Sequence, residues 1–232
     1  PDVTPEDVKP TGYTSVVYAS DNKTETQRLT SAGSNRVYKT IDEIPKDLQH
    51  AFVAIEDERF YEHNGIDPKG IVRAGMIGLT TGDFSQGAST LTQQLIKNNI
   101  FDFMSEDTFF DRLERKIQEQ YLALKLEKQM SKSEIMENYL NTINLGQNTL
   151  GVQAASQRYF NKDVSQLTLS ESAVIAAITQ SPSYYNPITH PDHNADRRKQ
   201  VLKNMLEQGY ISQEAHECLA VAMNRIHGKS NT

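Results

Sequence analysis

Helix start signals recur along most of this chain, and they limit what it can fold into. The capping box, in which a hydroxyl and a carboxyl satisfy the free amides of a helix's first turn, occurs twice, at Ser131 with Glu134 and at Thr168 with Glu171. Residues 173–178 are apolar almost all round, as in a helix at the centre of a core. Together with the apolar periodicity, these signals predict a mainly α fold with roughly eight helices after Ile41.

The first forty residues differ from the rest. Residues 1–12 carry three prolines and several charges, which is typical of a linker, and because the chain starts at Pro1 we expect a membrane anchor before it. The β-prone stretches Thr14–Tyr18 and Arg36–Thr40 predict a short strand pair, a small N-terminal β-hairpin, within 13–40. We expect residues 41–232 to form one domain, since a chain of 232 residues can bury a sizeable core.

The charge balance argues against one class of partner. Cys218 is the single cysteine, which leaves no internal disulfide and no zinc spacing. Lysine and arginine total 24 against 30 aspartate and glutamate, a net charge of −6. We therefore expect no nucleic-acid binding, and any site for an anion must be local.

A cluster of carboxylates follows the first predicted helix. Apolar residues on one face of that helix lead directly into the stretch Glu56-Asp57-Glu58-Arg59-Phe60-Tyr61-Glu62-His63-Asn64-Gly65. A second dense segment, rich in hydroxyls and amides and closed by a cation, is Gly87-Ala88-Ser89-Thr90-Leu91-Thr92-Gln93-Gln94-Leu95-Ile96-Lys97-Asn98. A carboxylate together with a polar, cationic cradle suggests glycosyl or phosphoryl substrates.

Several cations stand near these segments. Glu119 lies four residues after Arg115 and three after Lys116, so the three form one polar stripe on a predicted helix. Ordinary salt bridges explain such a stripe about half the time. The functional alternative is that Arg73 and Lys97 join Arg115 and Lys116 to hold a pyrophosphate, which guanidinium and ammonium groups bind well.

A short apolar segment next to this cradle breaks the usual pattern. Its large side chains, interspersed with polar residues, are Phe101, Phe103, Met104, Phe109 and Phe110. They could line the core, or they could form a surface that dips into lipid beside the active cleft.

Four motifs occur in a fixed order along the chain. They are Glu56-Asp57-x-x-Phe60-x-x-His63-x-Gly65, Gly87-x-Ser89-Thr90-x-Thr92-Gln93-Gln94, Arg115-Lys116-x-x-Glu119 and Lys132-x-x-Ile135-x-Glu137-x-Tyr139-Leu140-Asn141. Their order resembles the successive motifs of the peptidoglycan glycosyltransferases, the polymerase domain of class A penicillin-binding proteins and of monofunctional transglycosylases. The resemblance spans residues 41–187.

The resemblance implies a lysozyme-like fold of two helical lobes around a long cleft. It implies an enzyme that joins lipid II to a growing lipid-linked glycan chain through β-1,4 bonds, with inversion and with release of undecaprenyl pyrophosphate. It also implies work at a membrane surface, the extracytoplasmic face of the bacterial cell membrane, and binding of moenomycin-type inhibitors.

Roles for individual residues follow from this reaction. The attacking hydroxyl needs a general base, for which Glu56 is the candidate. Glu119 is the second catalytic candidate, expected to orient Arg115 and Lys116 more than to transfer a proton. The departing pyrophosphate needs positive charge, from these cations or from a divalent ion such as Mg or Mn, and no organic cofactor is expected. The remaining candidates for substrate binding are Asp57, Ser89, Gln93 and Tyr139.

For two of the polar residues, a structural role is an alternative to a functional one. Asp57 could cap a helix or support Glu56. His63 lacks the spaced partners of a metal site, so a structural hydrogen bond is the expected role. Two other functions also stay open, a lytic transglycosylase or muramidase on the same fold and a non-catalytic membrane-docking module. A lytic enzyme needs a carboxylic acid that protonates its leaving oxygen, so a cluster of cations favours the polymerase.

Overall fold

The described part of the chain is mainly α-helical, as the sequence predicts. The structure is a computed structural model, and it describes residues 2–11, 14–18, 20, 25–30, 36–81, 87–101, 108–147 and 149–219. The α-helices are α1 (Lys46–Glu56), α2 (Pro68–Thr81), α3 (Leu91–Ile100), α4 (Phe109–Leu126), α5 (Lys132–Thr142), α6 (Val152–Phe160), α7 (Leu169–Ala176) and α8 (Pro191–Glu207). Short 3-10 turns are η1 (Pro5–Val8), η2 (Ile41–Glu43) and η4 (Val164–Gln166).

The helices begin where the sequence places their caps. Ser131 N–H donates to Glu134 Oε2 at 2.7 Å, and Thr168 N–H donates to Glu171 Oε2 at 2.9 Å, so both predicted capping boxes form. A third box, Thr90 with Gln93, starts α3. Each box satisfies amides that a first helical turn leaves free, which fixes the helix boundary.

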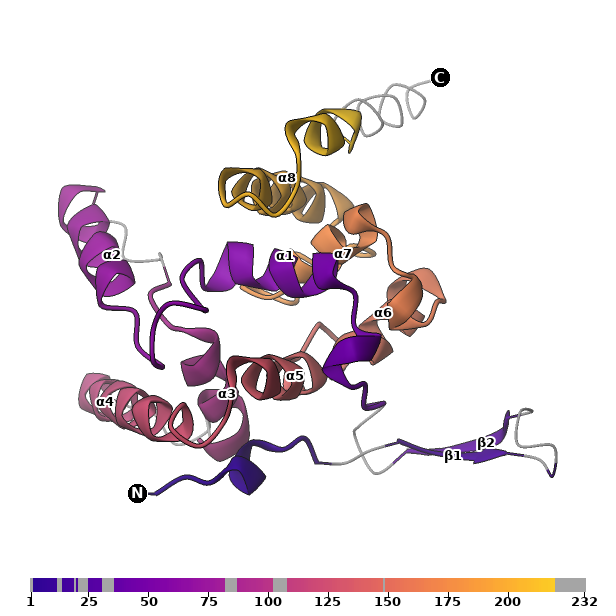
Figure 1. The fold of residues 1–232 in the computed structure, drawn as a ribbon, viewed down its shortest axis with the longest axis horizontal. Coiled ribbons are helices and arrows are strands. Elements are labelled where there is room, and N and C mark those ends of the chain that lie inside the picture. Colours follow the sequence, from indigo (N-terminus) through magenta and orange to yellow (C-terminus); the bar gives the residue numbers. More distant parts are fainter. Residues whose placement is uncertain are drawn as a thin grey trace.

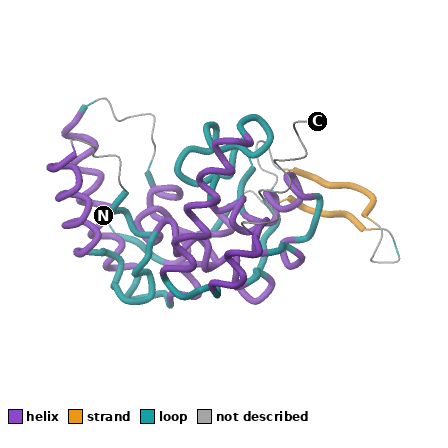
Figure 2. Tube along the Cα trace, turned by 90° about the horizontal axis from the view of Figure 1, so that it is seen from above, coloured by secondary structure: helices purple, strands orange, loops and turns teal. Residues whose placement is uncertain are grey.

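The two strands form an antiparallel pair, with Thr14 opposite Thr30. They are β1 (Thr14–Tyr18) and β2 (Glu25–Thr30), and the pair projects from the helical body (Figures 1 and 2). The prediction that Arg36–Thr40 forms the second strand was wrong, since β2 is Glu25–Thr30. The backbone there is bound by a side chain of α5 instead of a strand, because Lys39 N–H donates to Asn141 Oδ1 at 2.8 Å and Lys39 O accepts from Asn141 Nδ2 at 2.7 Å.

The core joins two groups of helices. α1 packs against α7 and α8, while α3 packs against α4 and α5 (Figure 1). Leu48 and Phe52 of α1 are fully buried, and residues 173–178 are all buried, as predicted for a central helix. Within the described ranges, no helix has the length and apolarity needed to cross a bilayer.

Candidate active site

A pocket of about 380 Å³ opens where the end of α1 meets α3 and α4. The predicted site residues that line it are Glu56, Ser89, Lys97, Lys116 and Glu119. Gln94, Asn144, Thr179 and Gln180 also line it. Residues from three of the four sequence motifs therefore meet in one cavity that combines carboxylates, ammonium groups and neutral polar side chains.

Glu56 ends α1 with its carboxyl group in this pocket, and 13% of its side chain is exposed. Gln94 Nε2 donates to Glu56 Oε2 at 3.0 Å, and the Thr179 hydroxyl donates to Oε1. Arg197 Nη2 lies 3.6 Å from the same Oε1 atom. These contacts hold the Glu56 carboxyl group in one orientation in the pocket.

The opposite wall of the pocket carries the cations. Glu119 is fully buried, and its carboxylate accepts from Arg115 Nη1 and, at 2.7 Å, from Lys116 Nζ. Lys116 Nζ also donates to Ser89 Oγ at 2.8 Å, and Lys97 lines the same pocket. A buried carboxylate is stable only with such partners. The spacing-based prediction that Glu119 pairs with both cations is confirmed.

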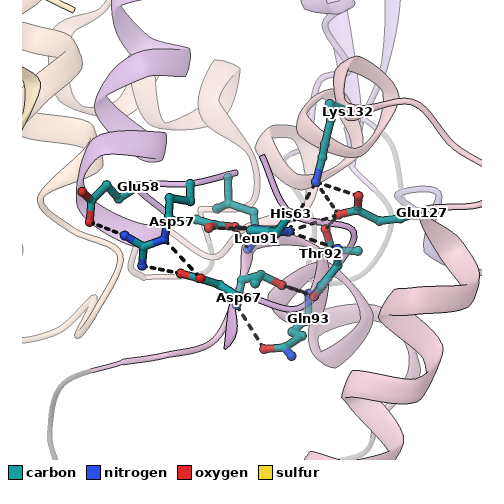
Figure 3. Close-up of polar contacts among 12 residues, drawn as sticks. Asp57, Glu58, His63, Asp67, Leu91, Thr92, Gln93, Glu127 and Lys132 are labelled. Carbon is teal, nitrogen blue, oxygen red and sulfur yellow. Dashed lines mark hydrogen bonds and ion pairs between the residues drawn. The ribbon is translucent and has the colours of Figure 1, made fainter. Parts of the chain in front are cut away.

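Asp57 lies behind the pocket and fixes the start of α3. Its Oδ2 atom accepts from Leu91 N–H at 2.9 Å, and its carboxylate contacts His63 Nε2 at 2.9 and 3.0 Å (Figure 3). Because His63 Nδ1 accepts from Gly65 N–H at 3.0 Å, the ring proton is on Nε2 and donates to Asp57. The predicted structural hydrogen bond of His63 is confirmed, and Asp57 caps a helix.

The same network reaches further along the chain. Lys132 Nζ lies 2.6 Å from Glu127 Oε2, and Thr92 Oγ1 donates to Glu127 Oε1 at 2.6 Å (Figure 3). In a separate pair close by, Arg59 Nη2 donates to Asp67 Oδ2 at 2.6 Å, just before α2 (Figure 3). Burial alone would raise the pKa of Asp67, but the bonds from Arg59 and from a backbone amide hold the pKa below its ordinary 3.8.

Five of the predicted substrate-binding residues do not line the pocket, namely Asp57, Arg73, Gln93, Arg115 and Tyr139. Gln93 is 3% exposed, and its Oε1 accepts from Thr90 N–H at 3.0 Å in the α3 cap. Tyr139 is fully buried, and burial first, then the nearby negative charges of Glu56 and Asp57, raise the pKa of its hydroxyl well above 10.0. Neither Gln93 nor Tyr139 lines the pocket, so direct contact with a substrate stays a prediction for both residues. Arg73 is exposed on α2 and pairs with Glu58 at 2.9 Å.

The aromatic segment is only partly described. Phe101 is half-buried and packs against the core, while Phe110 is 76% exposed at the start of α4, and contact of either with lipid stays a prediction. Phe103, Met104 and the side chain of Phe109 lie outside the described residues.

The predicted divalent ion finds no ready-made site among the described residues. Mg²⁺ and Mn²⁺ need several oxygen ligands around one point. No group of three histidine, cysteine, aspartate or glutamate side chains is arranged for that in the described ranges. The described residues therefore form no such cluster, and a divalent ion that bridges the pyrophosphate stays a prediction, with no step assigned to it.

Sequence reasoning missed three residues around Glu56. Gln94 was inside a quoted motif, but its neighbour Gln93 was assigned the role. Thr179 and Arg197 come from the last third of the chain, and no local pattern ties them to Glu56.

Comparisons with known proteins identify the family of this chain. The family model described as "Transglycosylase" matches residues 22–206. Penicillin-binding protein 1A of Escherichia coli is 50% identical over 179 residues, 77% of this chain and 20% of that protein. Penicillin-binding protein 1A of Aquifex aeolicus is 48% identical over 182 residues, 78% of this chain and 24% of that protein.

Further matches are of the same kind. Penicillin-binding protein 1F of Bacillus subtilis is 48% identical over 77% of this chain and 24% of that protein. The crystal structure of penicillin-binding protein 1A from Haemophilus influenzae aligns with a TM-score of 0.48 and 25% identity, over 89% of this chain and 20% of that chain. The chain spans 20–24% of the length of these curated relatives. It belongs to the transglycosylase family, as a peptidoglycan glycosyltransferase domain of the class A penicillin-binding protein type.

Proposed function

We propose that this domain polymerises lipid II into β-1,4-linked glycan strands, with Glu56 as the general base and undecaprenyl pyrophosphate as the leaving group. One observation carries the proposal: the carboxylate of Glu56 and the ammonium groups of Lys97 and Lys116 line the same pocket. A base on one wall and cations on another are what an attack by a hydroxyl and the departure of a diphosphate require.

The chemistry balances with these groups. The sugar 4-hydroxyl of an incoming lipid II gives its proton to Glu56, and its oxygen forms a bond to the anomeric carbon of the growing chain. The bond from that carbon to the diphosphate breaks, and the diphosphate leaves with the bonding electron pair. Attack opposite the leaving group converts the α-linkage into a β-linkage, which is inversion.

Positive charge stabilises the departing diphosphate. Lys97 and Lys116 are placed for this, and Glu119 with Ser89 holds the Lys116 ammonium group. A pyrophosphate needs no proton in order to leave, so no carboxylic acid is required on this wall. In this mechanism Glu119 orients Lys116 and Arg115, and Glu56 transfers the proton.

The two groups of helices support the lysozyme-like, two-lobed part of the proposal. Glu56 and Thr179 reach the pocket from the end of α1 and from the turn after α7, whereas Lys97 and Lys116 reach it from α3 and α4. The pocket therefore lies between the two groups, as a cleft between lobes does.

A membrane surface is also part of the proposal. α2 and α4 lie at the same end of the molecule (Figure 1), and both helices carry exposed apolar side chains. These residues are Ile71, Val72, Met76 and Leu79 of α2, and Phe110, Leu113, Ile117, Tyr121 and Leu124 of α4. We call them the apolar face, and its exposure favours contact with lipid at the extracytoplasmic side, where the lipid-linked substrates are held.

Incubation with lipid II tests the function. The domain should produce glycan strands and undecaprenyl pyrophosphate, a moenomycin-type inhibitor should block both, and Glu56→Gln should abolish both without a change in Tm. Solubilised cell wall with no glycan strands would support a lytic enzyme instead, and no product in either assay would support a docking module. Near-normal turnover by Glu56→Gln would show that another group takes the proton. A repeat with EDTA tests whether a divalent ion contributes.

A further inference from the structure

Two hydrogen bonds connect Glu56 to the buried Tyr139 through the side chain of Gln94. The Tyr139 hydroxyl donates to Gln94 Oε1 at 3.1 Å, and Gln94 Nε2 donates to Glu56 Oε2 at 3.0 Å. Tyr139 on α5 is fully buried, whereas Gln94 on α3 lines the pocket. We propose that Tyr139 is a positioning residue for the base, which fixes the Gln94 amide so that its NH2 group, and not its carbonyl, faces Glu56.

A glutamine amide alone does not determine which way it points. Its two ends have nearly the same shape but opposite hydrogen-bonding character, so the neighbouring groups decide its orientation. A buried tyrosine hydroxyl that loses its acceptor is costly. The raised pKa of Tyr139 keeps this hydroxyl protonated, so it needs the carbonyl end of Gln94 as its acceptor. The NH2 end must then point at Glu56.

The orientation matters for the base. When the NH2 group of Gln94 faces Glu56, each oxygen of the Glu56 carboxylate accepts one hydrogen bond, from Gln94 on Oε2 and from Thr179 on Oε1. A carboxylate oxygen has two lone-pair sites, so each keeps one for the incoming hydroxyl. With the amide reversed, a carbonyl oxygen would face the carboxylate. Two acceptors at that distance repel, which turns the carboxyl group out of line or favours its protonated form. This inference rests on the proposed function, in which Glu56 is the base.

Tyr139→Phe is the direct test, because it removes the hydroxyl and keeps the ring. The kcat for lipid II should fall about tenfold, the effect expected from one hydrogen bond. The KM should stay within about twofold, because the ring does not line the pocket. Tyr159→Phe is the matched control, since it removes a 2.6 Å bond from a tyrosine hydroxyl to Leu145 O, away from Glu56. Its kcat should not change.

A double-mutant cycle separates this role from packing. Gln94→Met keeps the length of the side chain but removes both amide ends. If Tyr139 acts through Gln94, adding Tyr139→Phe to Gln94→Met should change kcat by less than about twofold. Losses that multiply would show that Tyr139 acts by another route, and the proposal would be overturned. A wild-type kcat in Tyr139→Phe would overturn it as well.

A spectroscopic measurement covers the case in which Tyr139→Phe does not fold. The side-chain amide protons of labelled Gln94 should shift in the NMR spectrum when Glu56→Gln removes the charge they face. Amide protons that do not respond would overturn the proposal without any use of Tyr139→Phe. Failure of the proposed function gives a different result, because the wild type would then make no glycan strands from lipid II, or Glu56→Gln would retain turnover.

Discussion

Gly65→Ala should destabilise the domain strongly, because the glycine combines an unusual backbone conformation with a tight contact. Its φ is +97°, a region that residues with a side chain rarely adopt. A Cβ atom built there would lie 2.6 Å from Ala123 O and 2.7 Å from Ala123 C, both in the backbone of α4. Backbone atoms of a helix cannot rotate away as the end of a flexible side chain can.

The magnitude follows from these two parts. The left-handed conformation costs about 1 kcal/mol for alanine. Relieving the contact requires a shift of the loop or of α4, which is comparable to overpacking a core and costs about 1–3 kcal/mol. The shift also strains the bonds from Gly65 N–H to His63 and from Thr90 Oγ1 to Gly65 O. We expect the free energy of unfolding to fall by about 3 kcal/mol.

Gly209→Ala separates the cost of the backbone conformation from the cost of the steric contact. Gly209 also has a positive φ, +77°, but a Cβ there would meet nothing within 4 Å. It should therefore show only the conformational cost. Urea unfolding followed by circular dichroism gives both free energies by linear extrapolation. If Gly65→Ala costs no more than Gly209→Ala, the contact with α4 does not carry the effect and the reasoning is refuted.

Three further changes probe charge, acidity and surface. Lys116→Met should lower kcat for lipid II about 100-fold, because a group that stabilises the leaving diphosphate is lost, whereas Arg73→Met, outside the pocket, should stay within about twofold of the wild type. The pKa of Asp67 is lowered in the folded state, so its contribution is fully present above pH 3.8 and is lost as the pH falls through the folded pKa. Asp67→Asn should accordingly flatten the acid side of a plot of unfolding free energy against pH, and an unchanged slope would contradict this. Ile117→Ser should weaken binding to lipid vesicles in a flotation assay, and Ile188→Ser, equally exposed at 61% but outside the apolar face, should not.

The sequence predicted local features well because their causes are local. Capping boxes and the (i, i+3) and (i, i+4) pairs of Glu119 depend on residues a few positions apart, and the structure contains them. The position of β2 was missed for the opposite reason. Arg36–Thr40 has β-prone residues, but the side chain of Asn141, more than a hundred positions away, takes the hydrogen bonds that a strand would need.

The candidate site shows the same division. Glu56, Lys97 and Lys116 belong to short motifs, so their types and spacing pointed to the chemistry. Burial cannot be read from a motif, so the sequence did not show that Gln93 and Tyr139 are buried and absent from the pocket lining. Thr179 and Arg197 reach Glu56 only through tertiary packing, and a single sequence contains no pattern that connects them.

The helix α8 adds contacts to the candidate site that lie outside the motifs. Asn204 and Gln208 donate to Ala54 O at 3.0 and 3.1 Å, and so they tie down the last turn of α1 next to Glu56. Arg197 from the same helix lies near the Glu56 carboxylate. A fragment cut before Pro191 would thus keep all four motifs but lose the side chains that hold the end of α1 and contact Glu56. Boundaries chosen for expression or for grafting this domain should follow that dependence and not the limits of motif similarity.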